Sequence, residues 1–236
     1  MARVRDYTVV DLEMTGLSAK SDRIIEIGAV RVRGGLEADC FHALVNPLRP
    51  LPQEICTLTG ITDEMAAGGA AEDDAVPALL DFVGEDVIVG HNVGFDYSFL
   101  KQWAVNNRRP LQMRACDTLR MARALLPRQQ PKRLECLCVY FHVERTCAHR
   151  AVDDARETWQ IYECLAELAE KNAPALLEPK VLNYRAKRQT PATARQVERL
   201  RQLREKYRID DEICWDTLTR SQASRLQDTY YAAYGR

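Results

Sequence analysis

The pattern of apolar and polar positions gives the first part of the chain the periodicity of β-strands. Residues 7–10 are aromatic and β-branched, which favours a buried strand. Residues 24–32 are apolar and alternate in their later half, and Gly34-Gly35 separates them from a third run over residues 37–45. Three strands joined by short links predict an antiparallel meander.

From residue 53 onward the apolar spacing becomes mostly helical. It predicts a short helix near residues 53–58 and longer helices over residues 75–83, 95–107, 118–126, 134–141 and 151–171. A short apolar run over residues 87–90 reads as one more strand. An antiparallel start followed by strands and helices in alternation predicts an α/β fold with a mixed sheet flanked by helices.

The last quarter of the chain has a different pattern. Residues 174–190 contain proline and charged residues without clear periodicity, which is typical of a linker. Two helices should follow, each behind a capping box, at Thr193-x-x-Gln196 and Thr219-x-x-Gln222. We therefore expect a main domain over residues 1–175, a linker over 176–190 and a small basic helical module over 191–236.

Charge separates the same two regions. Residues 180–236 carry thirteen Lys and Arg against seven Asp and Glu, a net charge of +6. The first 179 residues carry twenty basic and twenty-seven acidic side chains, a net charge of −7. The basic tail suggests a polyanionic partner, although a solubilising charged face or a protein-docking surface is the alternative.

Composition indicates a soluble protein of the cytoplasm. The sequence is 46% hydrophobic, yet it contains no apolar run long enough to span a bilayer, and its first residues lack an apolar signal core. We expect no membrane association. The eight cysteines are irregularly spaced, which favours reduced thiols over a disulfide framework.

Two carboxylates follow the first strand pattern at alternate positions. Side chains two residues apart on a strand point to the same face, so Asp11 and Glu13 should project side by side. Buried anions this close repel each other, and a divalent cation bound by oxygen atoms is the simplest way to neutralise them. A solvated acidic edge strand is the alternative, but the residues before Asp11 have the character of an interior strand.

Two further acidic residues lie near expected helix starts. Asp96 is in the segment HNVGFD after the strand at 87–90, and Asp154 is in the segment HRAVDDARE at the start of the long helix. Acidic residues at such places also complement the helix dipole, and for Asp153 we prefer that interpretation. Asp154 lies beside the buried stripe of the helix, and His149 lies just before it.

Together these segments resemble the three motifs of the DEDDh 3′→5′ exonucleases. They are Asp11-x-Glu13, Asp96 within HNVGFD, and His149 with Asp154. The stretches DRIIEIGAVRV, LVNP and LTGITDEM resemble the polymerase-associated branch, typified by the proofreading epsilon subunit of bacterial DNA polymerase III. The resemblance covers about residues 5–172 and implies a ribonuclease H-like fold.

The resemblance also implies a mechanism and its residues. In this family four carboxylates bind two divalent ions, Mg²⁺ or Mn²⁺, and a histidine is the general base. Carried over, Asp11 contacts both ions, Glu13 and Asp154 lie on the side of the attacking water, and Asp96 acts on the other ion. His149 takes a proton from that water. The expected reaction releases nucleoside 5′-monophosphates from a single-stranded or frayed 3′ end of DNA, with RNA as a possible substrate.

Substrate contacts are expected at two segments. The resemblance implies that the residues after the first motif hold the terminal nucleotide; they are Met14, Thr15, Gly16 and Leu17. Three residues around the second motif would line the cleft; they are His91, Asn92 and Phe95. A simple turn at Thr15-Gly16 and core packing of Phe95 are the alternatives.

A group of cysteine and histidine residues raises the question of a zinc site. The group is Cys136, Cys138, His142 and Cys147. Cys138 falls on the buried stripe of its expected helix and Cys136 falls off it, so one helix cannot turn both toward one ion. We therefore favour ordinary packing over zinc binding.

Two other functions remain open from the sequence. The segments DLEMTG and DRIIEI also resemble oligoribonuclease, so an RNA-trimming enzyme of the same superfamily is one alternative. A non-catalytic nucleic-acid-binding accessory protein of a polymerase is another, but none of the five motif residues has been replaced. A DNA polymerase is a possible partner.

Overall fold

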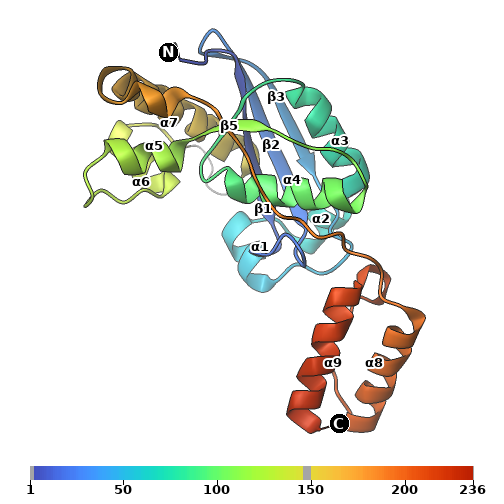
Figure 1. The fold of residues 1–236 in the computed structure, drawn as a ribbon. Helices are drawn as coiled ribbons and strands as arrows, with labels where there is room; N and C mark the ends of the chain where they lie inside the picture. The colour runs from blue at the N-terminus through green and yellow to red at the C-terminus, as the bar shows by residue number, and fades with distance from the viewer. Residues whose placement is uncertain (1–2, 146–149, 236) are drawn as a thin grey trace.

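A six-stranded mixed sheet forms the centre of the protein in a computed structural model that describes residues 3–145 and 150–235 (Figure 1). The strand order is β3-β2-β1-β4-β5-β6. β1–β3 are antiparallel, β4 and β5 continue parallel to β1, and β6 is antiparallel at the edge. The strands are β1 (Tyr7–Met14), β2 (Ile24–Arg33), β3 (Leu36–Leu44), β4 (Ile88–Gly90), β5 (Arg114–Asp117) and β6 (Lys180–Val181).

The antiparallel meander and the mixed sheet expected from the sequence are confirmed. Two strands were not predicted, because β5 has four residues and β6 has two, too few to show a periodicity. These short strands are defined by pairing with a distant part of the chain, as Arg114 of β5 pairs with Val181 of β6.

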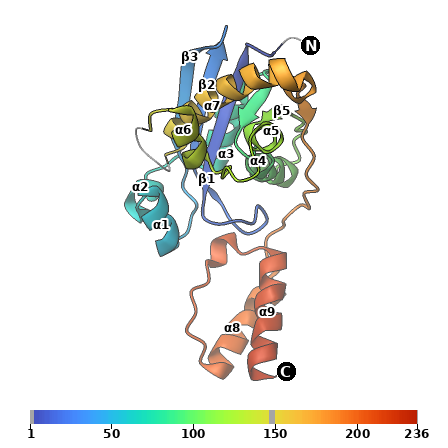
Figure 2. The same ribbon diagram turned by 90° about the vertical axis from the view of Figure 1, so that its left-hand side faces the viewer.

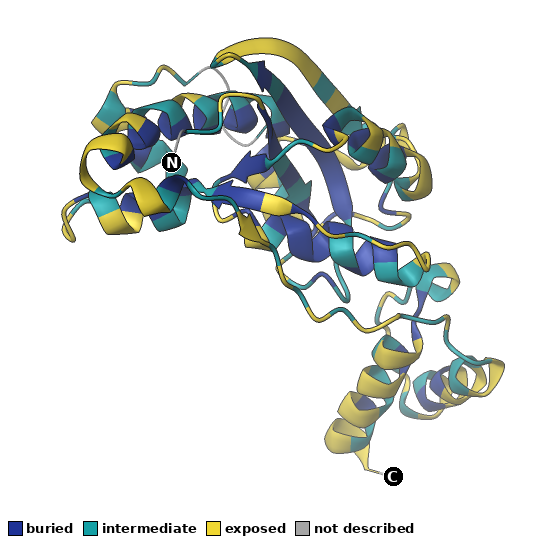
Figure 3. Ribbon diagram, turned by 45° about the horizontal axis from the view of Figure 1, so that its top comes forward, coloured by how far each residue is buried: buried dark blue, intermediate teal, exposed yellow. Residues whose placement is uncertain are grey.

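Alternation along β1 divides the core into two layers. Val10 and Leu12 face the layer covered by α3 and α4, whereas Tyr7 and Val9 face the layer covered by α5, α6 and α7 (Figures 1 and 2). Figure 3 shows buried residues along the strands in the interior of the sheet. The bounds are α3 (Glu72–Val83), α4 (Gly94–Asn106), α5 (Thr118–Leu125), α6 (Leu134–Phe141) and α7 (Ala151–Asn172). Asp11 lies two residues after Val9 on the strand, so its side chain points to the same face, the one covered by α7.

Two short helices cover one end of the sheet. α1 (Gln53–Thr59) was expected, whereas α2 (Asp63–Ala67) is too short to show a helical period. Both pack with Ile25 of β2 in a small separate core. Among the described residues, no helix is both long and apolar enough to cross a membrane.

The stretch interpreted as a linker lies against the main domain. It begins with the end of a 3₁₀ turn, Pro174–Leu177, continues through β6 and then runs in extended form beside α4. The backbone N–H of Leu182 donates to the carbonyl of Met113 at 2.9 Å. Further on, the Gln102 amide donates to the carbonyl of Lys187 at 2.8 Å. The division of the chain at this stretch stays a proposal.

The C-terminal module is a helical hairpin beyond the end of the sheet (Figure 1). Its helices are α8 (Ala194–Tyr207) and α9 (Arg220–Tyr234), with a 3₁₀ turn at Trp215–Thr217 between them. Both expected capping boxes are present, at the N-termini of α8 and α9. The module has a small core of its own, made by Leu200, Leu203, Leu218, Ala223 and Tyr230.

Candidate active site

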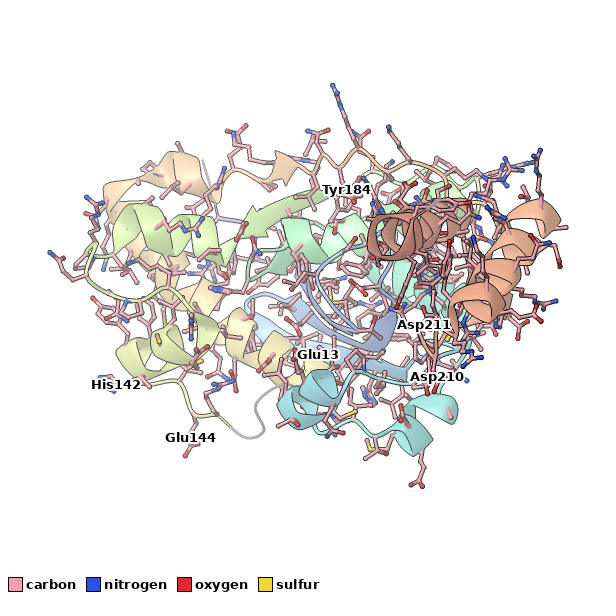
Figure 4. The ribbon with its side chains drawn as sticks, turned by 90° about the horizontal axis from the view of Figure 1, so that it is seen from below. Glu13, His142, Glu144, Tyr184, Asp210 and Asp211 are labelled. Atoms are coloured by element: carbon pink, nitrogen blue, oxygen red, sulfur yellow. The ribbon has the colours of Figure 1, made fainter. Side chains whose placement is uncertain are left out.

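Three acidic side chains converge where α7 crosses the end of β1. Asp11 and Glu13 project from the α7 face of β1, and Asp154 comes from the first turn of α7. One carboxylate oxygen of each residue lies within 4.8 Å of those of the other two. Figure 4 shows Glu13 among the side chains at this end of the sheet. The structure therefore brings together three of the four expected carboxylates as a candidate metal-binding group.

A glycine on β2 allows this crossing. Gly28 pairs with Asp11 in the β1–β2 register. A Cβ atom on Gly28 would lie 2.1 Å from the carbonyl carbon of Ala151, the first residue of α7, so any other residue would push the helix away. Because Gly28 lets the start of α7 lie directly on the sheet, Asp154 reaches the carboxylates of β1.

Asp96 approaches the same strand from the opposite layer. It lies in the first turn of α4, is 6% exposed, and accepts a hydrogen bond of 3.1 Å from the backbone N–H of Leu12. The ladder between β1 and β4 ends at Val9, which leaves the N–H of Leu12 free of strand pairing on that side. Asp96 therefore takes the place of a strand partner beside Asp11.

The electrostatics of the group fit a cation site. Burial raises the pKa of Asp11 well above its ordinary value, and the charges of Asp96 and Glu13 raise it further. Burial and the charge of Asp154 raise the pKa of Glu13 to about 8, and burial raises the pKa of Asp96 to about 7. Full ionisation near neutral pH therefore requires positive charge. A donor set made only of carboxylate oxygens suits Mg²⁺ or Mn²⁺.

A buried glutamate that the sequence analysis did not single out fixes the start of α7. Glu26 is fully buried on β2, pairs with Glu13 across the strands, and receives hydrogen bonds from Arg150 at 2.7 Å and from the N–H of Ala151 at 2.9 Å. His42 lies 2.7 Å from the same carboxylate. Although burial raises the pKa of Glu26, these hydrogen bonds outweigh burial and the net pKa is lowered. The sequence does contain a sign of this residue's role, because Glu26 interrupts the apolar run IIEIG.

An arginine pairs with the site from the α6–α7 connection. The Arg145 guanidinium lies 3.3 Å from a carboxylate oxygen of Asp154 and donates at 2.9 Å to Glu157, one turn further along α7. His149, the expected general base, lies outside the described residues. Its role stays a prediction from the sequence.

The residues after Glu13 have mixed surroundings. Met14 is 6% exposed and packs into the α3–α4 core. Thr15 is 4% exposed; its hydroxyl accepts from the N–H of Arg23 at 3.0 Å and is also contacted by Arg49. Both side chains are thus engaged inside the protein. Their predicted contact with substrate is untested.

Gly16 and Leu17 lie at the surface of the same loop. A Cβ on Gly16 would meet the Asp22 carboxylate at 2.7 Å, so the loop closes tightly there. Leu17 is 86% exposed, the largest exposed fraction among the large apolar side chains that the structure describes as exposed. Among the four predicted contacts in this segment, Leu17 is the one whose side chain is freely accessible.

The second predicted segment lies where β4 leads into α4. The ring of His91 is 2.9 Å from the Thr118 hydroxyl, and burial lowers the pKa of His91. Asn92 adopts a positive φ of 64°, and its N–H donates to Asp117 at 3.1 Å. Phe95 packs edge-to-face on Phe99 with ring centroids 5.5 Å apart and is partly exposed.

The cysteines of the possible zinc group do not point to one place in the described part of the chain. Cys138 is buried, with its thiol 3.5 Å from Glu157, whereas Cys136 is partly exposed. His142 is exposed at the C-terminal end of α6, and Cys147 lies outside the described residues. All seven cysteines that the structure describes are free thiols.

Comparisons with known proteins found a matching family model and similar chains. The family model of the RNase T exonucleases matches residues 8–162. The PolC-type DNA polymerase III of Bacillus subtilis strain 168 is 40% identical over 171 residues, which cover 70% of this chain and 12% of that protein. The PolC-type DNA polymerase III of Clostridium perfringens strain 13 is 38% identical over 156 residues, which cover 66% of this chain and 11% of that protein. The chain thus spans about one eighth of the length of these relatives.

A solved structure supports the fold. Exonuclease X in complex with 5′ overhanging duplex DNA aligns with a TM-score of 0.58 at 22% identity, covering 73% of this chain and 99% of that one. The ribonuclease H-like fold expected from the sequence is therefore confirmed. The chain belongs to the RNase T exonuclease family.

Proposed function

We propose that the protein is a 3′→5′ exonuclease of the DEDDh type that removes nucleoside 5′-monophosphates from DNA. One observation carries the proposal: the carboxylates of Asp11, Glu13 and Asp154 lie within 4.8 Å of one another, in a chain of the exonuclease family. Asp96, bonded to Leu12 from the other side of β1, is the fourth member.

Two divalent ions, Mg²⁺ or Mn²⁺, would be held by Asp11, Glu13, Asp96 and Asp154. When bound, they supply positive charge for the attacking water and the leaving 3′ oxygen. The protein prepares for them by holding the carboxylates in place. Gly28 allows α7 to reach the sheet, and Glu26 fixes the first residues of that helix through Arg150 and Ala151.

His149 is the proposed general base. An imidazole with an ordinary pKa near 6.5 takes up a proton readily near neutral pH. In the sequence His149 lies two residues before α7, the helix that carries Asp154. We propose that it removes a proton from the attacking water and that Asp154 helps to orient that water.

DNA is the proposed substrate because the similar proteins are named as DNA polymerases of the PolC type. The same names support a role near a DNA polymerase, either as a partner or in repair of polymerase products. Trimming of RNA is the alternative, since a 2′-hydroxyl is recognised by local contacts. Matched DNA and RNA oligomers of one sequence distinguish the two substrates.

The test uses a 5′-labelled single-stranded DNA and the two variants Asp154→Asn and Asp153→Asn. We expect a ladder that shortens by one nucleotide at a time in Mg²⁺ or Mn²⁺ and does not form in chelator. Asp154→Asn should abolish the ladder. Asp153→Asn is the matched control, because Asp153 is the neighbouring acidic residue and pairs with Arg156 at 3.6 Å. Internal cuts, or loss of the 5′ label as a mononucleotide at the first step, would contradict the proposal.

A further inference from the structure

A hollow of about 450 Å³ lies between the main domain and the C-terminal module. It is lined by three separate parts of the chain: the loop after β1, the first turns of α4, and the C-terminal region. We call it the Tyr184 hollow, and its principal side chains are Leu17, Lys20, Phe95, Ser98, Tyr184 and Arg225. Tyr184 and Arg225 lie outside the 8–162 segment that matches the family.

Two segments that carry the carboxylates also line the Tyr184 hollow: the end of β1 with the loop after it, and the first turn of α4. Phe95 directly precedes Asp96, which hydrogen-bonds to Leu12 of β1. Leu17 follows the last residue of β1, Met14, by three positions and is exposed at the rim. A strand whose terminal nucleotide sits at the carboxylates therefore has this hollow as an adjoining space on the α4 side.

The lining has the chemistry that a nucleic-acid strand requires. Lys20 and Arg225 supply positive charge, Phe95 and Tyr184 supply aromatic rings, and no acidic side chain is among the residues that the structure describes around the hollow. Lysine and arginine neutralise phosphates, and aromatic rings stack on bases of any sequence. In the proposed function the carboxylate group holds the metal ions, so the two sites divide metal binding from phosphate binding.

Tyr184 is held firmly enough to act as a platform. Its segment is anchored before it by the hydrogen bond from Leu182 to Met113 and after it by the bond from Gln102 to Lys187, and Tyr184 itself packs on the α3–α4 core. It also lines a second hollow of about 390 Å³ further along α4, which contains Lys101. Figure 4 shows Tyr184 on the extended segment that leads to the module. A fixed ring loses little freedom when a base stacks on it.

We propose that the Tyr184 hollow binds the nucleotides on the 5′ side of the one being removed. Tyr184 stacks on a base, and Lys20 and Arg225 contact the backbone phosphates. The inference rests on the proposed exonuclease function and gives the C-terminal module a direct part in holding the substrate strand.

The test compares two substrates in the full-length protein. The p-nitrophenyl ester of thymidine 5′-monophosphate offers one nucleotide, whereas a single-stranded DNA decamer also reaches the hollow. We expect Tyr184→Ala to lower the ratio of kcat/KM for the decamer to that for the ester by roughly tenfold, through KM, because one stacked base is lost. Tyr184→Phe keeps the ring and should lower this ratio by less than about twofold.

A second variant tests the charge. Arg225→Ala should lower the same ratio and reduce the slope of log affinity for the decamer against log salt by roughly one. Arg220→Ala and Tyr140→Ala are the controls, since both residues are exposed and neither lines the hollow. Equal losses on ester and decamer, or no loss on either, would overturn the inference while the wild-type ladder still supports the exonuclease. A wild-type protein that cleaves neither substrate would contradict the proposed function and the inference together.

Discussion

The carboxylate end of the sheet and the C-terminal module differ in how they handle like charges. At the sheet, Asp96 and Asp154 are 6% and 7% exposed, and burial with nearby charge raises the pKa of Glu13 to about 8. In the module, the basic residues of α8 are mostly exposed, and its capping boxes are local to each helix. The first region concentrates negative charge in the interior, and the second spreads positive charge over a surface.

In the proposed function, this difference separates chemistry from binding. The buried carboxylates come together because three features coincide. Strand alternation places Asp11 and Glu13 on one face, Gly28 lets α7 bring Asp154 to them, and the first turn of α4 brings Asp96. These carboxylates then require cations. Exposed basic side chains need no such support, and each can make an independent phosphate contact. Changes at the sheet should therefore affect catalysis strongly, and changes in the module should affect affinity weakly.

The largest effect is expected for Asp11→Asn. Removing one charge from the shared carboxylate should cost several kcal/mol of transition-state stabilisation, a loss on the order of 10³-fold or more in kcat. The metal-free protein should remain folded, because the substitution also removes repulsion among buried anions. Single-turnover kinetics and a thermal melt in chelator provide both measurements. If Asp11→Asn kept activity within tenfold of wild type, or melted at a much lower temperature in chelator, the proposed difference between the two regions would be wrong.

His149→Ala should lower kcat by roughly 10² to 10⁴ while KM changes little, because a general base acts in the transition state. In the wild-type protein the rate should fall on the acid side as the imidazole gains a proton. The variant should lose that part of the pH profile. A variant within a few-fold of wild type would place the base elsewhere.

Glu26→Gln tests whether the fold enforces the site. Glu26 is fully buried and pairs with Arg150, which is one third exposed, so we expect a loss of about 2 to 3 kcal/mol of unfolding free energy. Activity should fall as well, because the start of α7 loses its anchor. Glu37→Gln is the control, since Glu37 of β3 forms an exposed ion pair with Arg156 of α7, the same helix that Glu26 anchors. Equal denaturation midpoints for the two variants would contradict this role.

The metal-free protein should become less stable as pH rises. The pKa of Glu13 is raised to about 8, well above the ordinary value near 4 expected for the unfolded chain, so the folded protein holds a proton that the unfolded chain releases. That stability is complete below pH 4 and is lost by pH 8. Between pH 5 and 7, Glu13→Gln should reduce the loss by up to about 1.4 kcal/mol per pH unit. Urea unfolding in chelator at several pH values measures this loss of unfolding free energy. Equal slopes of unfolding free energy against pH for Glu13→Gln and wild type would refute the prediction.

The smallest effect is expected on the surface of α8. Arg195→Ala should weaken binding of single-stranded DNA a few-fold and reduce the salt slope by roughly one or less. Glu198→Ala on the same helix is the control, because both residues are exposed. Fluorescence anisotropy at several salt concentrations makes the comparison. Identical slopes for the two variants would favour a solubilising or protein-docking role for α8.

Local patterns predicted much of this structure. The alternation that places Asp11 and Glu13 on one face, and the capping boxes of α8 and α9, are encoded within a few residues. The start of α7 and the position of Asp154 near it were also expected, because the buried stripe of a long helix is readable in sequence. The motif resemblance then gave the correct family and fold.

Features that depend on distant pairing were not predicted. Glu26 and Arg150 are separated by 124 positions, and no local period connects them. Tyr184 and Phe95 meet at one hollow only because the chain returns along α4 after β6.

The central claim is that the four carboxylates form a divalent-metal centre. Isothermal titration of Mn²⁺ into the full-length protein with thymidine 5′-monophosphate present tests it most directly. We expect two ions per wild-type chain, loss of at least one in Asp11→Asn, and wild-type binding in Asp153→Asn. Absence of Mn²⁺ binding by the wild type, or equal binding by wild type and Asp11→Asn, would contradict the claim.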